Sequence, residues 1–293
     1  MQSTIRIASL CPSNTELLCA LGLGDQIVGV DQYSDYPENV VSRVPKLGPD
    51  LHIDIDALTA LRPDLVVSSL SVPGMEKVVE AVHHAGLTQV TLSPHSFEDV
   101  LQDASRIADA LPESVRREIA VQSLVDALRS RLLRVTEATA PLKERPSVYI
   151  EWWPNPIFSP ARDNWLTELC DRAGARNIFA DRHGSQVQDD GQQVVDAQPD
   201  VVLTCWTGIP QHKVPLEKIK RRSGWQTTPA FTRQHLFVLS EGLYCRPSPR
   251  LFDGLEQLLG LLHPEVAKRL GLAAPAAYGP IRDWYGDWLE KSW

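Results

Sequence analysis

The feature that most constrains the fold is a phrase that occurs twice. "ALRPDLVVSS" covers residues 60–69 and "DAQPDVVLTC" covers residues 196–205. In each copy a helix-like segment meets Pro-Asp and is followed by a short apolar run. A proline disfavours the α conformation in the residue before it, so we expect a helix to end before Pro63 and before Pro199. A buried strand should follow each turn. The repeat therefore predicts two similar α/β lobes.

Short runs rich in β-branched residues alternate with helical patterns through both halves. The helical patterns end at glycine or proline, as in "NTELLCALGLG" and "IDALTALRP". This alternation predicts parallel sheets covered by helices on both faces. The predicted strands are "IRIASL", "QIVGV", "DLVVSS", "TQVTLS", "SVYIEW", "RNIFA", "DVVLTC" and "LFVLS".

The segment between the halves has a different pattern. Residues 112–140 contain no glycine and no internal proline, and apolar residues recur at helical spacing from Val121 to Val135. We expect one helix of roughly 40 Å here, acting as a strut. The predicted organisation is an N-terminal lobe over 1–111, a helix over 112–140, and a C-terminal lobe with a tail over 141–293. The fold class is α/β, with two Rossmann-like lobes joined by one long helix and facing each other across a cleft.

Composition and missing motifs exclude several classes of function. The net charge is −8, which argues against nucleic acid as a partner. No apolar run is long enough to span a bilayer. The five cysteines form no CxxC pair, and the histidines have no metal-ligand spacing, so we expect no metal site. GxGxxG, P-loop, GxSxG and HExxH signatures are absent, so we expect a binding protein rather than an enzyme.

Candidate ligand contacts follow the strands, at the edge where open α/β sheets bind ligands. Ser13 and Glu16 stand three apart, which predicts a capping box at the first strand-to-helix turn and places Pro12 and Ser13 at this edge. Large rings follow other strands and would form a flat wall for a rigid, mostly apolar ligand. These aromatic candidates are Tyr33, Tyr36, Trp152, Trp153, Phe158, Trp206 and Tyr244.

Several of these stretches resemble a known family. "IASLCPSNTELLCALGLGDQIVGVDQYSDYP", "NPIFSPARDNWLTELCDRAGARNIF" and "CRPSPRLFDGLEQL" are similar to class III substrate-binding proteins of ABC importers, in particular to those that bind cobalamin (vitamin B12). The resemblance extends to about residue 265 and implies the class III periplasmic-binding-protein fold, with the ligand between the lobes. It also implies ligand contacts at Tyr33, Phe158, Gly242, Leu243, Tyr244 and Arg246, with Arg246 donating hydrogen bonds to a corrin amide or phosphate.

Departures from the family are equally specific. A family tryptophan is replaced near Asp50, which becomes a candidate contact, and Trp152, Trp153 and Trp206 could compensate for it. The family's two permease-docking glutamates correspond to Asp56 and Gln192, and a glutamine cannot make a bidentate carboxylate–arginine contact. Cys170 matches a family cysteine whose disulfide partner is absent here.

The resemblance implies a monomer that binds cobalamin or a related corrinoid, with an ABC permease as a possible partner whose docking residues are weakened. The N-terminus reads as a strand rather than a leader, so the sequence as written predicts a cytoplasmic location, and a trimmed leader would make it periplasmic or cell-surface. Two alternatives remain open: a ferric siderophore or haem binder, and a corrinoid-handling enzyme or chaperone that uses Cys11 or Cys245. We expect the tail aromatics, Trp284, Tyr285, Trp288 and Trp293, to pack on the second lobe.

Overall fold

The computed structural model describes residues 5–117 and 119–293. The chain divides into two compact units. Unit 1 contains the residues up to Arg129 together with Pro247–Pro249, and unit 2 contains Ser130–Arg246 and Arg250–Trp293. The boundary therefore falls inside the predicted strut helix rather than at its ends.

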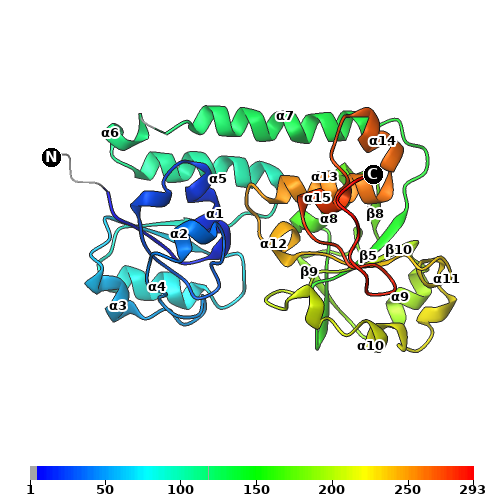
Figure 1. The fold of residues 1–293 in the computed structure, drawn as a ribbon. Coiled ribbons are helices and arrows are strands. Elements are labelled where there is room, and N and C mark those ends of the chain that lie inside the picture. The colour runs from blue at the N-terminus through cyan, green and yellow to red at the C-terminus, as the bar shows by residue number, and fades with distance from the viewer. Residues whose placement is uncertain (1–4, 118) are drawn as a thin grey trace. The chain divides into compact units, whose positions relative to one another are not determined.

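Unit 1 is built on a parallel sheet with the strand order β2-β1-β3-β4. Its first hundred residues are drawn in blue and cyan in Figure 1. Helices α3 and α4 pack on one face, where Leu58, Val78 and Val82 join Ala8 and Val66 of the sheet in one apolar cluster. Helices α1 and α5 cover the other face. The elements are β1 Ile7–Ser9, α1 Pro12–Ala20, β2 Ile27–Val30, α2 Glu38–Val41, α3 Ile55–Ala60, β3 Leu65–Ser69, α4 Glu76–His84, β4 Gln89–Leu92, α5 Phe97–Ala110 and α6 Glu113–Arg116.

Unit 2 repeats this sheet, with the order β11-β10-β5-β8 and parallel pairing throughout. A three-stranded antiparallel sheet, β6-β7-β9, is added to it. The elements are β5 Ser147–Glu151, β6 Trp153–Pro154, β7 Ile157–Pro160, α8 Trp165–Arg172, β8 Arg176–Asn177, β9 Gln186–Asp189, α9 Gln192–Ala197, β10 Val201–Thr204, α10 Leu216–Lys220, α11 Pro229–Thr232, β11 Leu236–Val238, α12 Glu241–Tyr244, α13 Leu251–Leu262, α14 Pro264–Arg269 and α15 Pro275–Tyr278.

All eight predicted strands are present, and the two copies of the repeated phrase have the same structure. The residue before each proline adopts the left-handed conformation, Arg62 with φ 48° and Gln198 with φ 49°. The aspartate after each proline then accepts a hydrogen bond from the backbone at the start of the first strand of its unit. Asp64 Oδ2 accepts from Arg6 N at 2.8 Å, and Asp200 Oδ2 accepts from Ser147 N at 3.0 Å. The repeat thus joins the first and third strands of each sheet.

Replacing Asp200 tests this role of the repeat. Asp200 Oδ2 also accepts from the Ser147 hydroxyl at 2.8 Å, so Asp200→Ala leaves two donors of Ser147 without their acceptor, and it removes the partner of the exposed Arg233 as well. We expect the free energy of unfolding to fall by about 2 kcal/mol, and by about 1 kcal/mol for Asp64→Ala, which loses a single hydrogen bond. Urea unfolding measures both. Asp200→Asn keeps an acceptor oxygen and should cost less than Asp200→Ala; equal losses for the two would contradict the account.

The predicted strut is shorter than expected. Helix α7 covers Val121–Thr139, about 28 Å, and the short α6 precedes it as a separate helix. The prediction of one continuous helix over 112–140 is therefore wrong. The physical reason lies in the pattern, because the apolar spacing that packs a helix against its neighbours begins only at Val121. Of the residues between the two helices, 118 lies outside those described.

Candidate functional site

In unit 1 the carboxyl end of β1 leads directly into α1. Pro12 is the first residue of this helix and Cys11 is its N-cap, with no side-chain capping bond. The predicted capping box is therefore wrong, because Ser13 lies inside the helix. Its hydroxyl is 3.4 Å from Cys11 Sγ, and both side chains are buried. Proline suits this position because the first helical N–H has no intrahelical acceptor.

Glu16, the other half of the predicted box, has a different role. Its carboxylate is buried and accepts a hydrogen bond from the Ser248 hydroxyl at 2.5 Å. Ser248 belongs to Pro247–Pro249, the short stretch that clusters with unit 1. The first residue of the Ser-Pro-Arg motif, which contributed to the resemblance, is therefore hydrogen-bonded to helix α1. Sequence spacing alone did not predict this contact.

A chain of hydroxyl groups fixes the loop that follows β2. Ser9 Oγ lies 2.7 Å from Thr15 Oγ1, which lies 2.8 Å from Ser34 Oγ, and the Ser34 hydroxyl donates to Asp31. Asp31 Oδ2 also accepts from Tyr33 N at 2.7 Å. Burial raises the pKa of the Asp31 carboxyl, and its hydrogen bonds with Ser34 and Tyr33 act in the opposite direction. This network holds the Tyr33 backbone in place while the side chain stays 48% exposed.

Asp50 lies near this network. Gln32 N donates to Gly48 O at 2.7 Å, which joins the loop after β2 to the loop that contains Asp50. The Asp50 carboxylate contributes to raising the pKa of Asp31 and of Cys11. Its own pKa is raised, chiefly by burial. The predicted contacts Pro12, Ser13, Tyr33 and Asp50 thus gather at one edge of the first sheet.

In unit 2 the predicted wall "WWPNPIF" forms a hairpin of β6 and β7. Trp153 lies opposite Phe158 in this antiparallel pair, and Trp153 Nε1 donates to Asn155 O at 3.0 Å. Trp153 is 41% exposed, while Trp152 and Phe158 are partly buried. The Trp152 ring lies 6.0 Å from the Trp165 ring. The sequence did not predict this hairpin because its strands are too short to show a period of two.

Three of the predicted ligand contacts have enclosed side chains in this structure. Trp206 is 6% exposed, and Leu243 and Tyr244 are each 1% exposed. The Tyr244 hydroxyl donates to Gln257 Oε1 at 2.9 Å. Gly242, in the same short helix, is also buried. In this structure these residues pack the interior of unit 2 and position the segments that carry them.

The charged candidates differ in exposure. Arg246 is 8% exposed and forms an ion pair with Glu241. The two predicted docking residues are exposed, Asp56 in the first turn of α3 and Gln192 in α9. The Gln192 amide donates to Asp196 Oδ1 at 2.9 Å, so it is held on its own helix.

A buried charge cluster in unit 2 was not predicted. Glu151, the last residue of β5, has no exposed surface. Its carboxylate accepts from Trp206 Nε1 at 3.0 Å, from the Tyr149 hydroxyl at 3.1 Å, and from both terminal nitrogens of Arg222. The guanidinium of Arg222 in turn lies 4.6 Å from the ring centre of Trp225. An acid at the end of the apolar strand "SVYIE" is the signal that could have revealed it.

The thiols do not support covalent or cobalt-ligating chemistry. Burial raises the pKa of Cys11 to about 11, so it remains a neutral thiol near pH 7. Cys245 donates its thiol proton to Cys205 O at 2.9 Å. All five cysteines are free, including Cys170, whose pKa burial raises to about 12.

Metal-ligating clusters and membrane-spanning helices are both missing from the described residues. Among these residues, no group of three or more histidine, cysteine and acidic side chains could hold a metal ion. No helix in the described part of the chain combines the length and the apolar character needed to cross a bilayer.

Comparison with known proteins gives the family. The sequence profile of the family described as "Periplasmic binding protein" matches residues 7–242. An ABC transporter substrate-binding lipoprotein of Bacillus subtilis, YvrC, described as uncharacterised, is 30% identical over 90% of this chain and 81% of its own. A vitamin B12-binding protein of Yersinia pestis is 25% identical over 88% of this chain and 86% of its own.

Solved structures share the fold. The vitamin B12-binding protein BtuF of Vibrio cholerae is similar with a TM-score of 0.73 at 24% identity, over 90% of this chain and 98% of that one. The haem-binding protein RhuT from Roseiflexus sp. RS-1 gives a TM-score of 0.77 at 22% identity, over 90% and 100%. These structures confirm the predicted α/β fold of class III binding proteins. The chain belongs to the periplasmic binding protein family, whose members are not enzymes but deliver small-molecule substrates to ABC importers.

Proposed function

We propose that the chain binds cobalamin or a related corrinoid as the substrate-binding protein of an ABC importer. The observation that carries the proposal is the exposure of flat rings beyond the strand ends of each unit. Tyr33 and Tyr36 are 48% and 47% exposed in unit 1, and Trp153 is 41% exposed in unit 2. Exposed rings on backbone held by hydrogen bonds suit a large, rigid macrocycle. The sequence similarity to vitamin B12-binding proteins supports the same ligand.

Charge favours a corrinoid over the more acidic alternatives. A ferric siderophore or haem with ionised carboxylates needs cationic partners in its site. Arg222 follows helix α10 and Arg246 follows helix α12 of unit 2. Each is already paired with a carboxylate, that of Glu151 and that of Glu241 respectively. Cobalamin presents mostly neutral amides and needs fewer free cations. Haem remains the second candidate, because haem-binding proteins are among the structural neighbours.

Parallel titrations test the ligand. Cyanocobalamin, haemin and a ferric siderophore are added to the protein, and binding is measured by quenching of tryptophan fluorescence and by equilibrium dialysis. We expect cyanocobalamin to bind most tightly. Tyr33→Ala and Trp153→Ala should each weaken it about tenfold, since each removes a stacking ring. Tyr285→Ala, which removes a still more exposed ring from the tail, is the matched control and should leave the affinity unchanged. Tight haemin binding without corrinoid binding would replace the proposal by its alternative.

The importer partner and the location are part of the proposal. Asp56 keeps an exposed carboxylate on α3, and beside the neutral Gln192 the exposed Asp190 accepts from Gln192 N at 2.9 Å. We propose that Asp56 and Asp190 take the place of the family's docking glutamates. The lipoprotein relative favours a location outside the cytoplasmic membrane over the cytoplasm. Fractionation of the native host, followed by detection with an antibody, tests the location.

A further inference from the structure

The outer strand β11 defines one edge of the second sheet. It consists of three apolar residues, Leu236–Val238, and pairs with β10 on one side only. An edge strand presents backbone N–H and C=O groups that can accept a strand from another chain. This edge strand carries no lysine and no proline, two of the usual local protections, so its shortness is the protection that its own residues provide.

The C-terminal tail covers this edge. Val238 N donates to Arg282 O at 2.8 Å, and Arg282 N donates to Val238 O at 3.0 Å, an antiparallel bridge. Arg282 in turn bridges Trp288, and Leu289 N donates to Ile281 O at 2.9 Å. Residues 281–289 are therefore a small hairpin, called here the tail hairpin, lying along β11. In Figure 1 it is part of the red segment.

Two hydrogen bonds to the Asp283 side chain and one glycine form the turn of the tail hairpin. Asp283 Oδ1 accepts from Tyr285 N at 2.9 Å and from Asp287 N at 3.0 Å. Gly286 adopts φ 88°, the left-handed conformation that a tight turn needs and that glycine adopts without strain.

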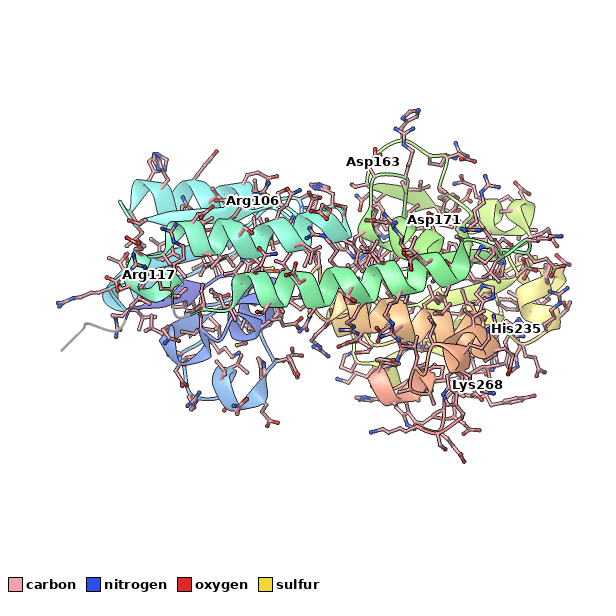
Figure 2. All side chains as sticks on the ribbon, turned by 90° about the horizontal axis from the view of Figure 1, so that it is seen from above. Arg106, Arg117, Asp163, Asp171, His235 and Lys268 are labelled. Carbon is pink, nitrogen blue, oxygen red and sulfur yellow. The ribbon has the colours of Figure 1, made fainter. Side chains whose placement is uncertain are left out.

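Side chains attach the hairpin to unit 2. Ile281 has no exposed surface, and Trp284 packs edge-to-face on Phe231 with ring centres 5.2 Å apart. Lys220 Nζ lies 4.8 Å from the centre of the Trp284 ring. Arg282 Nη1 donates to Gln211 O at 2.6 Å. The expected packing of the tail aromatics on this lobe is confirmed for Trp284, whereas Tyr285, Trp288 and Trp293 are 68%, 52% and 48% exposed. Past the hairpin, Lys268, labelled in Figure 2, lies over the Trp293 ring at 5.2 Å.

We infer that the tail hairpin occupies, within the chain, a strand-pairing interface that would otherwise accept β11 of a second copy. The antiparallel bridge at Val238 shows that the backbone groups of this residue face outward in a geometry that takes a partner strand. Two copies of β11 pairing antiparallel would form a closed, two-fold symmetric contact. The tail hairpin keeps the chain monomeric because it already occupies the edge of β11 with which a second copy would pair.

Truncation tests the inference. The full chain and a chain ending at residue 280 are compared by size-exclusion chromatography with light scattering at rising concentration. We expect the full chain to keep the mass of one copy and the truncated chain to shift to twice that mass. Val238→Pro in the truncated chain removes the N–H that faces the edge, and should restore a single copy.

Further variants keep the test decisive if the truncated chain does not fold, as judged by circular dichroism. Arg282→Pro with Trp284→Ala, in the full-length chain, removes one backbone bond to β11 and the contact with Phe231. We expect this variant to dimerise and the Val238 amide to exchange hydrogen at least about tenfold faster. A folded truncated chain, or a folded double variant, that stays monomeric at every concentration overturns the inference. So does a full-length chain that dimerises as strongly as the truncated one.

Discussion

Glu151→Ala will destabilise unit 2 by about 3–5 kcal/mol, the largest loss we expect from a single substitution in this chain. The substitution removes the acceptor for the Trp206 indole and the Tyr149 hydroxyl, and it leaves Arg222 without its carboxylate. Arg222 is only 21% exposed, so its charge cannot be rehydrated fully. Removing one partner of a buried ion pair leaves the other charge buried and uncompensated. This destabilises the fold by far more than the ion pair itself stabilises it.

The chain offers a selective probe for this measurement. All eight tryptophans lie at or after residue 152, so tryptophan fluorescence reports on unit 2 alone, while far-ultraviolet circular dichroism reports on both units. During urea unfolding we expect the fluorescence transition of Glu151→Ala to move to lower urea. The part of the dichroism transition that belongs to unit 1 should stay in place.

A double-mutant cycle separates the ion pair from the other hydrogen bonds. Glu151→Gln and Arg222→Met are the two single variants. Together they remove both charges while an acceptor oxygen remains for Trp206 and Tyr149. We expect the double variant to be more stable than Glu151→Ala, with a coupling energy of about 2 kcal/mol between positions 151 and 222. Additive effects of the two single substitutions would show that the pair is not a unit and would contradict the expected cost.

Asp103→Asn will stabilise unit 1 at neutral pH, the opposite of what removing an ion-paired acid usually does. The Asp103 side chain in α5 is 2% exposed, and Arg106, which projects from the same helix (Figure 2), pairs with it at 2.8 Å. Burial raises the pKa of Asp103 to about 6, with the Arg106 hydrogen bond acting against the rise and Asp99 adding to it. The pairing with Arg106 therefore does not offset the desolvation of the carboxylate.

The sign of the pH dependence follows from linkage. The pKa of Asp103 is 3.8, the ordinary value for an aspartate, in the unfolded chain and about 6 in the folded chain. The contribution of Asp103 to the free energy of unfolding is therefore present in full below the pKa of the unfolded chain, and it is lost as the pH rises through 6. Asparagine does not titrate, so the variant and the parent should be equally stable near pH 4. At pH 7 to 8 the variant should be about 2 kcal/mol more stable.

Urea unfolding followed by circular dichroism across this pH range measures the difference. Asp109→Asn is the matched control, because Asp109 pairs with an arginine, Arg116, from a side chain that is 76% exposed. Because exposed ion pairs contribute little, we expect Asp109→Asn to change the free energy of unfolding by less than about 1 kcal/mol. A stability difference for Asp103→Asn that stays constant with pH would mean that the pKa of this carboxyl is not raised in the folded chain.

Sequence reasoning located the elements of the fold but not their caps or short strands. The repeated Pro-Asp phrase, the strand runs and their alternation with helices led to the two parallel sheets that the structure contains. The capping box, the single long helix over 112–140 and the β6–β7 hairpin were not predicted correctly. Each depends on where a segment packs, because a serine near a helix start or an apolar residue in a short strand has no decisive local preference.

The candidate site also contains features that the sequence predicted and features that it did not. Tyr33 and Trp153 follow the carboxyl ends of β2 and β5 in the sequence and lie there in the structure, since the carboxyl ends of parallel strands share one edge. Phe158 lies inside β7, opposite Trp153. The local sequence did not predict which of the aromatic rings face solvent. Trp206 and Tyr244 have the same local signal as Trp153, yet both are enclosed. Their exposure depends on partners far along the chain, Glu151 and Gln257, and no local pattern identifies these.

The sequence by itself determined that this chain forms two similar α/β sheets, because periodicity and turn residues act over a few neighbouring positions. Only the tertiary structure decided that Glu151 gathers Tyr149, Trp206 and Arg222, that Ser248 returns to Glu16, and that the tail covers β11. Most of these contacts join residues far apart in sequence, and burial selects the partner by removing the competing water.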